Sequence, residues 1–350
     1  MAREPRFIEV GSSTIIGSEG RKRSFYMKKL FAVLVCITWI LLFTDKTEAC
    51  DFCLLTQGIS PLETIKGKGI RITERYTVLK SVYQRDDKLD IHGAKEEYWT
   101  TEFTGFYGIT EKITVLAVVP VKKNIMEGHF HVHKDGSTGV HTDNKGNEFG
   151  LGDVAVLGRY TFLRKHSLDT TTNIAGLAGV KFPTGKTDGR REDNSSRYLD
   201  SHMQLGTGST DFLLGLSMSH SVRRLTISTN LLGAITTEGE AGNEKHQFGN
   251  SLNYDLTARY RVYPGVISPS GQQLFFAFGI NGEVRGKEEE EGVELANSGG
   301  HTVYLSPGVQ VVMAPHWVFE LSYSHPVYHK LNGIQLGEDY KISGGVTYLF

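Results

Sequence analysis

The chain ends in the stretch YKISGGVTYLF, which occupies residues 340–350. Its side chains alternate: Ile342, Gly344, Val346, Tyr348 and Phe350 share one face, and small or polar residues fill most of the other. Successive side chains of a strand point to opposite faces, so this period of two suits a strand with lipid on one side and a watery lumen on the other. The stretch predicts a transmembrane strand that ends a β-barrel.

The composition is compatible with such a barrel. The 350 residues include 40 Gly, 15 Tyr and 18 Phe, and their formal net charge is -1. This balance argues against a nucleic-acid-binding protein, which usually carries a basic excess, so no nucleic acid is expected as a partner. The hydrophobic fraction of 39% is low for a membrane protein. Barrel strands alternate apolar and polar residues, however, and need no continuous apolar run.

An export signal begins some way into the chain. Met27-Lys28-Lys29 gives a short basic region, residues 30–43 a mostly apolar core, and Thr47-Glu48-Ala49 a cleavage site that ends in a small residue. We expect residues 27–49 to be a cleaved signal peptide and residues 1–26 to be a mis-start or a dispensable extension. The alternative is an uncleaved signal anchor. The apolar core is short for that role, because a membrane-spanning helix needs about 20 residues.

Two cysteines, Cys50 and Cys53, follow the predicted cleavage site as a C-x-x-C pair. In an oxidising compartment the pair can form a disulfide. It can also bind a metal, exchange thiols, or offer Cys50 for lipidation. A c-type haem site is excluded because Leu54 stands where that motif needs His. Residues 50–68 are expected either to stay in the periplasm or to enter the lumen as a plug, and for a plug, deletion of residues 50–67 should raise the conductance.

Twelve segments reach the length of roughly 9 to 11 residues that a transmembrane strand needs. They are residues 69–84, 98–109, 113–122, 152–162, 171–183, 209–220, 225–236, 249–262, 273–283, 302–314, 317–328 and 340–350. Tight links alternate with long polar ones, as in outer-membrane barrels with short periplasmic turns and longer external loops. The sequence therefore predicts an all-β fold, a transmembrane antiparallel up-and-down β-barrel of about 12 strands over residues 69–350.

The faces of single strands favour a membrane barrel over a soluble β-sandwich. In residues 249–262, apolar and aromatic side chains alternate with a polar face that carries Asp255, Arg259 and Arg261. A barrel lumen tolerates such charges, whereas the hydrocarbon region does not. Glu74 departs from the pattern, because it falls in phase with the apolar residues of its segment. That first strand is therefore either irregular or outside the membrane at that end.

Several blocks of the sequence resemble a known family. They are GLGDV at residues 150–154, RYTF at 159–162, GVKFPTGK at 179–186, YLSPGVQ at 304–310, PVY at 326–328 and LNG at 331–333. These blocks are similar to those of outer-membrane β-barrel transporters named after the MetA pathway of phenol degradation, over roughly residues 69–350. The resemblance implies a Gram-negative outer membrane and the passage of small, often aromatic or hydrophobic, molecules. It assigns no functional residues.

Charged residues on the predicted lumen face are candidates for selectivity, because a pore selects by width, lining charge and apolar constrictions. They are Glu102, Arg159, Lys181, Asp255, Arg259 and Glu320. The alternative is that opposite charges pair across the lumen and only hold a narrow barrel rigid. We expect an outer-membrane channel for passive passage of small, aromatic or hydrophobic molecules, with a structural barrel without transport as an alternative.

The first long link contains a histidine cluster, His129, His131 and His133, with His141 downstream. On an extended segment the first three share a face, near enough to bind Cu²⁺, Ni²⁺ or Zn²⁺ together. A metal-linked barrel is therefore an alternative function, and no other cofactor is expected. The acidic run at residues 288–291 is expected to be a solvated loop tip.

The sequence does not predict an enzyme. A barrel hydrolase needs a nucleophile, a base and an orienting acid together at one rim, and no Gly-x-Ser-x-Gly elbow is present. The expected partners are outer-membrane lipid, a small-molecule solute, and the barrel-assembly machinery, which would recognise the C-terminal strand ending at Phe350.

Overall fold

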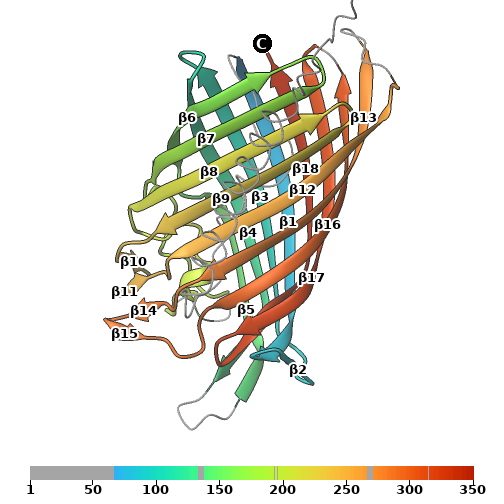
Figure 1. Ribbon diagram of the computed structural model, residues 1–350. Coiled ribbons are helices and arrows are strands. Elements are labelled where there is room, and N and C mark those ends of the chain that lie inside the picture. The colour runs from blue at the N-terminus through green and yellow to red at the C-terminus, as the bar shows by residue number, and fades with distance from the viewer. Residues whose placement is uncertain (1–66, 133–137, 193, 195, 266–270, 314) are drawn as a thin grey trace, which may run out of the picture. The chain divides into compact units, whose positions relative to one another are not determined.

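The computed structural model describes residues 67–350, except 133–137, 193, 195, 266–270 and 314, and gives only the backbone of residues 129, 131, 132 and 141–144. In this part of the chain, twelve antiparallel strands form a barrel that closes where β1 pairs with β18 (Figure 1). These strands are β1 (Lys68–Gln84), β3 (Lys95–Gly108), β4 (Ile113–Val132), β6 (Ala155–His166), β7 (Thr170–Lys181), β8 (Asp211–Val222), β9 (Leu225–Ile235), β12 (Ser251–Tyr263), β13 (Gln272–Arg285), β16 (Gly300–Met313), β17 (Trp317–Leu331) and β18 (Ile334–Leu349). The predicted barrel is confirmed, and each predicted segment overlaps one barrel strand, although β4 and β18 are longer than predicted.

The two faces of the wall follow the predicted alternation. In β18, Ile342 is 41% exposed, whereas its neighbour Lys341 is 3% exposed. In β12, Leu256 is exposed on the outer face, and Asp255 and Arg259 are buried on the inner one. An apolar outer face and a polar inner face are what a strand between lipid and a lumen requires.

Aromatic side chains gather near both ends of the outer face. Near one end are Trp99, Phe149, Phe182, Phe212 and Tyr328, and near the other are Tyr107, Phe162, Tyr263, Trp317 and Phe350, all exposed. Such girdles mark the two membrane interfaces of transmembrane barrels. No helix in the described part of the chain is long and apolar enough to cross a membrane.

The links between strands are short at one end of the barrel and long at the other. Residues 109–112, 167–169 and 223–224 form tight turns at the end where the C-terminus lies, the upper end in Figure 1. The long links at the opposite end, here called the loop end, contain the minor elements. These are β2 (Asp87–Leu89), β5 (Thr138–Leu151), the 3₁₀ helix η3 (Ser201–Met203), β10 (Gly239–Ala241), β11 (Glu244–Gln247), β14 (Glu289–Glu290) and β15 (Val293–Glu294).

The first long link forms a hairpin of its own. Within residues 123–151, β4 runs on to Val132 and pairs with β5. The period of two continues past the predicted strand end, since Asn124 and Met126 are buried and Lys123 is exposed. The hairpin therefore extends the wall at the loop end.

The predicted boundaries at residues 1–26, 27–49 and 50–68 fall largely before the described residues. The signal peptide, the Cys50–Cys53 pair and the plug segment lie outside the described part and stay predictions.

Candidate functional site

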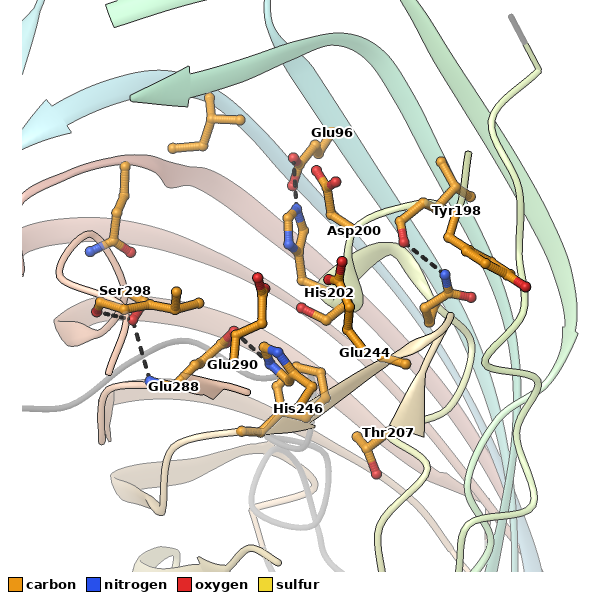
Figure 2. A pocket seen from close by; sticks show the side chains of 18 of the residues that line it. Glu96, Tyr198, Asp200, His202, Thr207, Glu244, His246, Glu288, Glu290 and Ser298 are labelled. Carbon is orange, nitrogen blue, oxygen red and sulfur yellow. Dashed lines mark hydrogen bonds and ion pairs between the residues drawn. The ribbon is translucent and has the colours of Figure 1, made fainter. Parts of the chain in front are cut away.

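A cavity of about 690 Å³ lies at the loop end of the barrel (Figure 2). Its walls come from β1, β3, β4, β13 and β18 and from three long links, at residues 182–210, 236–250 and 286–299. The lining is mixed. It includes the aromatic residues Tyr98, Phe130, Tyr198 and Phe248 as well as several carboxylates. A cavity of this size and lining suits a small molecule with both apolar and polar parts.

The link between β7 and β8 is fixed against the inner wall by Asn124. The Asn124 side-chain amide donates to the carbonyl oxygens of Met203 and Gln204, at 3.1 and 3.2 Å. The Tyr98 hydroxyl lies 3.3 Å from the sulfur of Met203. Met203 is completely buried, so η3 rests on the inner faces of β3 and β4.

The same link is held together internally by Gln204. Its side-chain oxygen accepts from the Gly189 amide at 2.8 Å, and its side-chain nitrogen donates to the Leu199 carbonyl at 2.8 Å. A buried side chain that satisfies backbone groups in this way gives a loop a single conformation. The link is therefore a built part of the cavity wall.

Lys181 anchors both ends of this link. Its ammonium lies 3.3 Å from Asp153 Oδ2 and forms a second ion pair with Asp211. Asp153 also accepts from the backbone amides of Gly185 and Thr207, at 2.9 and 2.8 Å. Of these contacts, sequence reasoning predicted only that Lys181 faces the lumen. It missed the partners, although Asp153 lies in the GLGDV block and Lys181 in the GVKFPTGK block.

Gly206 packs so closely against Asp153 and Gly185 that no other residue fits at this position. A Cβ atom at Gly206 would lie 2.7 Å from Asp153 Oδ1 and 2.6 Å from the Gly185 carbonyl oxygen. Real Cβ atoms essentially never approach other atoms this closely. A side chain at position 206 would push the link away from Asp153.

His202 forms an ion pair across the cavity wall. Its Nε2 lies 3.1 Å from Glu96 Oε1, and Figure 2 shows the two side chains pointing toward each other. Burial by itself lowers the pKa of His202, but the Glu96 carboxylate, with smaller contributions from Asp200 and Glu288, raises it to about 10. The imidazole is therefore a cation at neutral pH.

The two other links join over the cavity as a small sheet in the order β10, β11, β14, β15. Within it, His246 Nε2 lies 2.9 Å from Glu288 Oε2, and the Glu288 amide donates to Ser298 Oγ at 3.3 Å. The predicted solvated tip at residues 288–291 is therefore wrong for Glu288, which is buried. Burial, followed by the nearby Glu244 carboxylate, raises the pKa of Glu290 above its ordinary value.

The six predicted selectivity residues all lie on the inner side of the wall. Glu102, Arg159, Lys181, Asp255 and Arg259 are buried, and the Glu320 side chain is 9% exposed. Glu320 lies 2.8 Å from an Arg71 nitrogen, and Asp255 accepts from the Asn230 amide at 2.9 Å. The structure therefore shows that several are paired. Their role in selectivity stays a prediction.

An apolar area of the inner wall was not predicted. It runs across β3, β4, β6, β7, β8 and β9 and consists of Phe106, Leu116, Val118, Ala155, Leu157, Leu177, Leu213, Leu232 and Ala234. Each of these residues occupies an inward position of its strand. The signal was present in the sequence, since β8 reads DFLLGL and is apolar on both faces.

The predicted metal ligands are only partly described. The backbone of His129 pairs with that of His141 across the β4–β5 hairpin, and His131 pairs with Gly139. His133 lies outside the described residues. Among the side chains that the structure describes, no group of three His, Cys, Asp or Glu is arranged to hold a metal ion.

The fold resembles solved membrane barrels. An outer membrane channel from Pseudomonas putida F1 matches with a TM-score of 0.61 and 12% identity, over 84% of this chain and 100% of that chain. The β domain of the Bordetella autotransporter BrkA gives a TM-score of 0.43 and 12% identity, over 81% and 100%. The CymD monoaromatic hydrocarbon channel gives 0.38 and 11%, over 82% and 89%.

At 12% identity, the match to the Pseudomonas putida channel shows a shared fold. The matches to BrkA and CymD have TM-scores below 0.5 and carry no argument. No curated protein matches the sequence. The family model described as "Putative MetA-pathway of phenol degradation" matches residues 95–330, which include nine complete barrel strands, nearly all of β17, the three links that line the cavity, and the Lys181 cluster. The chain therefore belongs to this family.

Proposed function

We propose that this protein is a passive channel in the outer membrane of a Gram-negative bacterium and admits small, aromatic or hydrophobic molecules. The observation that carries the proposal is the cavity at the loop end of a closed barrel whose inner wall is part charged and part apolar. The family description, which names phenol degradation, and the fold shared with an outer membrane channel support it. Passage needs no catalytic group.

The protonation of His202 argues against one catalytic role for the cavity. His202, which faces the cavity, is held as a cation by Glu96, so it is a poor general base at neutral pH. The expected partners are the solute and the surrounding lipid. Assembly through the C-terminal strand, β18 followed by Phe350, remains part of this proposal.

The test is single-channel conductance of the refolded mature chain in planar bilayers, with benzoate added and with acetate as the matched non-aromatic anion. We expect benzoate, and not acetate, to alter the current. Phe248 lines the cavity, so Phe248→Ala should weaken the benzoate effect by about three- to tenfold, the worth of one aromatic contact. Val293→Ala, at an exposed loop position, is the control. Equal responses to both anions would contradict an aromatic preference, and a folded but silent barrel would contradict a channel.

We also propose a metal site in the β4–β5 hairpin. The backbone register supports it, because His129 and His141 pair directly across the hairpin and His131 follows two residues further along β4. Calorimetric titration with Cu²⁺, Ni²⁺ and Zn²⁺ should give about one ion per chain, and none in His129→Ala/His141→Ala. His166→Ala, at the turn end, is the control, and a stoichiometry near zero in the unmodified chain would dismiss the site.

A further inference from the structure

Arg261 places a buried cation on the inner wall near the turn end of the barrel. It lies in β12, two residues before the strand ends at Tyr263, and it is 6% exposed. Its Nε atom has no hydrogen-bond partner, and among the described residues no carboxylate pairs with its guanidinium. The charged side chain that acts on it is that of Arg224, another cation. A buried charge without a counter-ion is costly, so a negative ligand would stabilise it here.

Gln310 is a second buried side chain whose polar atoms have no partner. It lies in β16, three residues before Met313, and is 3% exposed. Neither its Oε1 nor its Nε2 atom forms a hydrogen bond within the described part of the chain. Arg261 and Gln310 are both cross-strand partners of Phe275 in β13. Neighbouring strands lie about 4.8 Å apart, so the three residues form a row about 10 Å across, here called the Arg261 row.

Phe275, in the middle of this row, faces the lumen. It is partly buried, whereas its neighbour Phe276 is 58% exposed on the outer face. The wall opposite is apolar, because β3 and β4 lie half-way round the ring of strands from β12 and β13. Phe106 and Leu116 are buried there, close to the turn-end limits of their strands. A ring that lies on Phe275 would therefore have apolar surface on both sides.

The two ends of the Arg261 row carry different charges. At one end, the Arg261 amide donates to the Arg224 carbonyl at 2.9 Å, which keeps the second arginine beside the first. At the other end, Gln310 pairs across the strands with Glu320, whose carboxylate lies 2.8 Å from an Arg71 nitrogen. A negative charge on a ligand is therefore favoured beside Arg261 and disfavoured beside Gln310.

We propose that the Arg261 row binds an aromatic carboxylate with a hydroxyl group on the far side of its ring. This identifies the class of solute for the channel proposed above, and so it rests on that function. The carboxylate, which only accepts, would pair with the Arg261 guanidinium, which only donates. The ring would lie on Phe275, and the hydroxyl, which donates and accepts, would bond the Gln310 amide, which does both. The order of the three side chains thus matches the order of the three groups in the solute.

The test is calorimetric titration of the full mature chain in detergent micelles at pH 7 with 4-hydroxybenzoate, benzoate and 4-hydroxybenzyl alcohol. Benzoate lacks the hydroxyl, and the alcohol lacks the charge. We expect 4-hydroxybenzoate to bind about three- to tenfold more tightly than benzoate and at least about tenfold more tightly than the alcohol. Arg261→Gln should weaken the binding of both acids about tenfold, and Gln310→Leu should weaken that of 4-hydroxybenzoate alone. Arg223→Gln, at a turn position that is 77% exposed, is the control.

Three outcomes would overturn the proposal: equal binding of 4-hydroxybenzoate and the alcohol, binding that Arg261→Gln leaves unchanged, and an equal loss of both acids in Gln310→Leu. Folding of each variant is checked by heat-modifiable migration on a gel. If Arg261→Gln does not fold, Arg261→Lys replaces it, since it keeps the charge but loses the planar fork and should weaken the binding of both acids about threefold.

This readout is separate from conductance. A barrel that conducts but binds the three compounds equally would keep the channel and remove the site. A silent barrel that binds them with the expected preferences would keep the site and remove the channel.

Discussion

The ammonium of Lys181 lies 3.3 Å from Asp153 Oδ2, and the two side chains are only 4% and 6% exposed. Asp211, equally buried, forms the second ion pair of this lysine. Lys181 ends β7, Asp211 begins β8, and Asp153 precedes β6. One cation therefore fixes three strand ends, and with them both ends of the link that forms the cavity wall.

Replacement of Lys181 by Met should strongly destabilise the barrel at this end. It leaves Asp153 and Asp211 buried without that cation, and loss of one partner of a buried ion pair costs about 3–5 kcal/mol. Urea unfolding of the refolded protein in lipid vesicles measures the change. Lys186→Met is the matched control, because Lys186 pairs with Glu148 at 3.2 Å while 48% exposed, and such pairs contribute about 0–1 kcal/mol. Equal losses in the two variants would show that Lys181 is not an anchor.

The His202–Glu96 ion pair predicts that the link at residues 182–210 becomes less stable at alkaline pH. The pKa of His202 is about 10 in the folded chain and about 6.5 in the unfolded chain. Because the folded value is the higher one, the stabilising effect is complete below about pH 6.5 and is lost as the pH rises through about 10. The His202 side chain is 40% exposed to the space inside the barrel, so water weakens the effect.

We therefore expect the link at residues 182–210 to loosen between pH 8 and pH 10.5, seen as more frequent current fluctuations in single-channel recordings. His202→Gln should fluctuate at every pH in this range, whereas His166→Gln, at the turn end, should behave as the unmodified chain does. A fluctuation rate that does not change with pH would contradict a role for this ion pair.

The strands were predictable from sequence because lipid imposes a period of two on every one of them. Glu102 and Arg259 could be placed on the inner side of the wall for the same reason, without knowledge of any contact. The cavity was not predictable, since Asn124, Met203 and Gln204 are brought together by hydrogen bonds between a strand and a distant link, which leave no periodic signal. The buried state of Glu288 was missed because a run of acids normally indicates solvent, and only its partner His246 reveals otherwise.

Because the outer face of the barrel wall meets lipid, we expect Leu256→Arg to destabilise the barrel severely. Leu256 is 52% exposed on the outer face of β12, within the apolar band. Arginine facing the middle of a bilayer costs about 2–4 kcal/mol in transmembrane barrels. Val293→Arg is the control, because Val293 is 66% exposed in the loop-end sheet and meets water. Refolding titrations in vesicles should separate the two variants, and similar stabilities would mean that β12 does not face lipid.

The Glu320–Arg71 pair decides between the two accounts of the lumen charges. The two side chains lie 2.8 Å apart on the inner wall. If these charges act on passing ions, Glu320→Gln removes one negative charge beside Arg71 and should shift the reversal potential in a KCl gradient toward anion selectivity. If they only brace the wall, the same variant lowers the unfolding free energy, by about 1–3 kcal/mol for a lost charged hydrogen bond, and leaves the reversal potential unchanged. Glu289→Gln, at the loop-end surface, should change neither quantity, because its charge already lies in bulk water. The two measurements on one pair of variants therefore distinguish selectivity from rigidity.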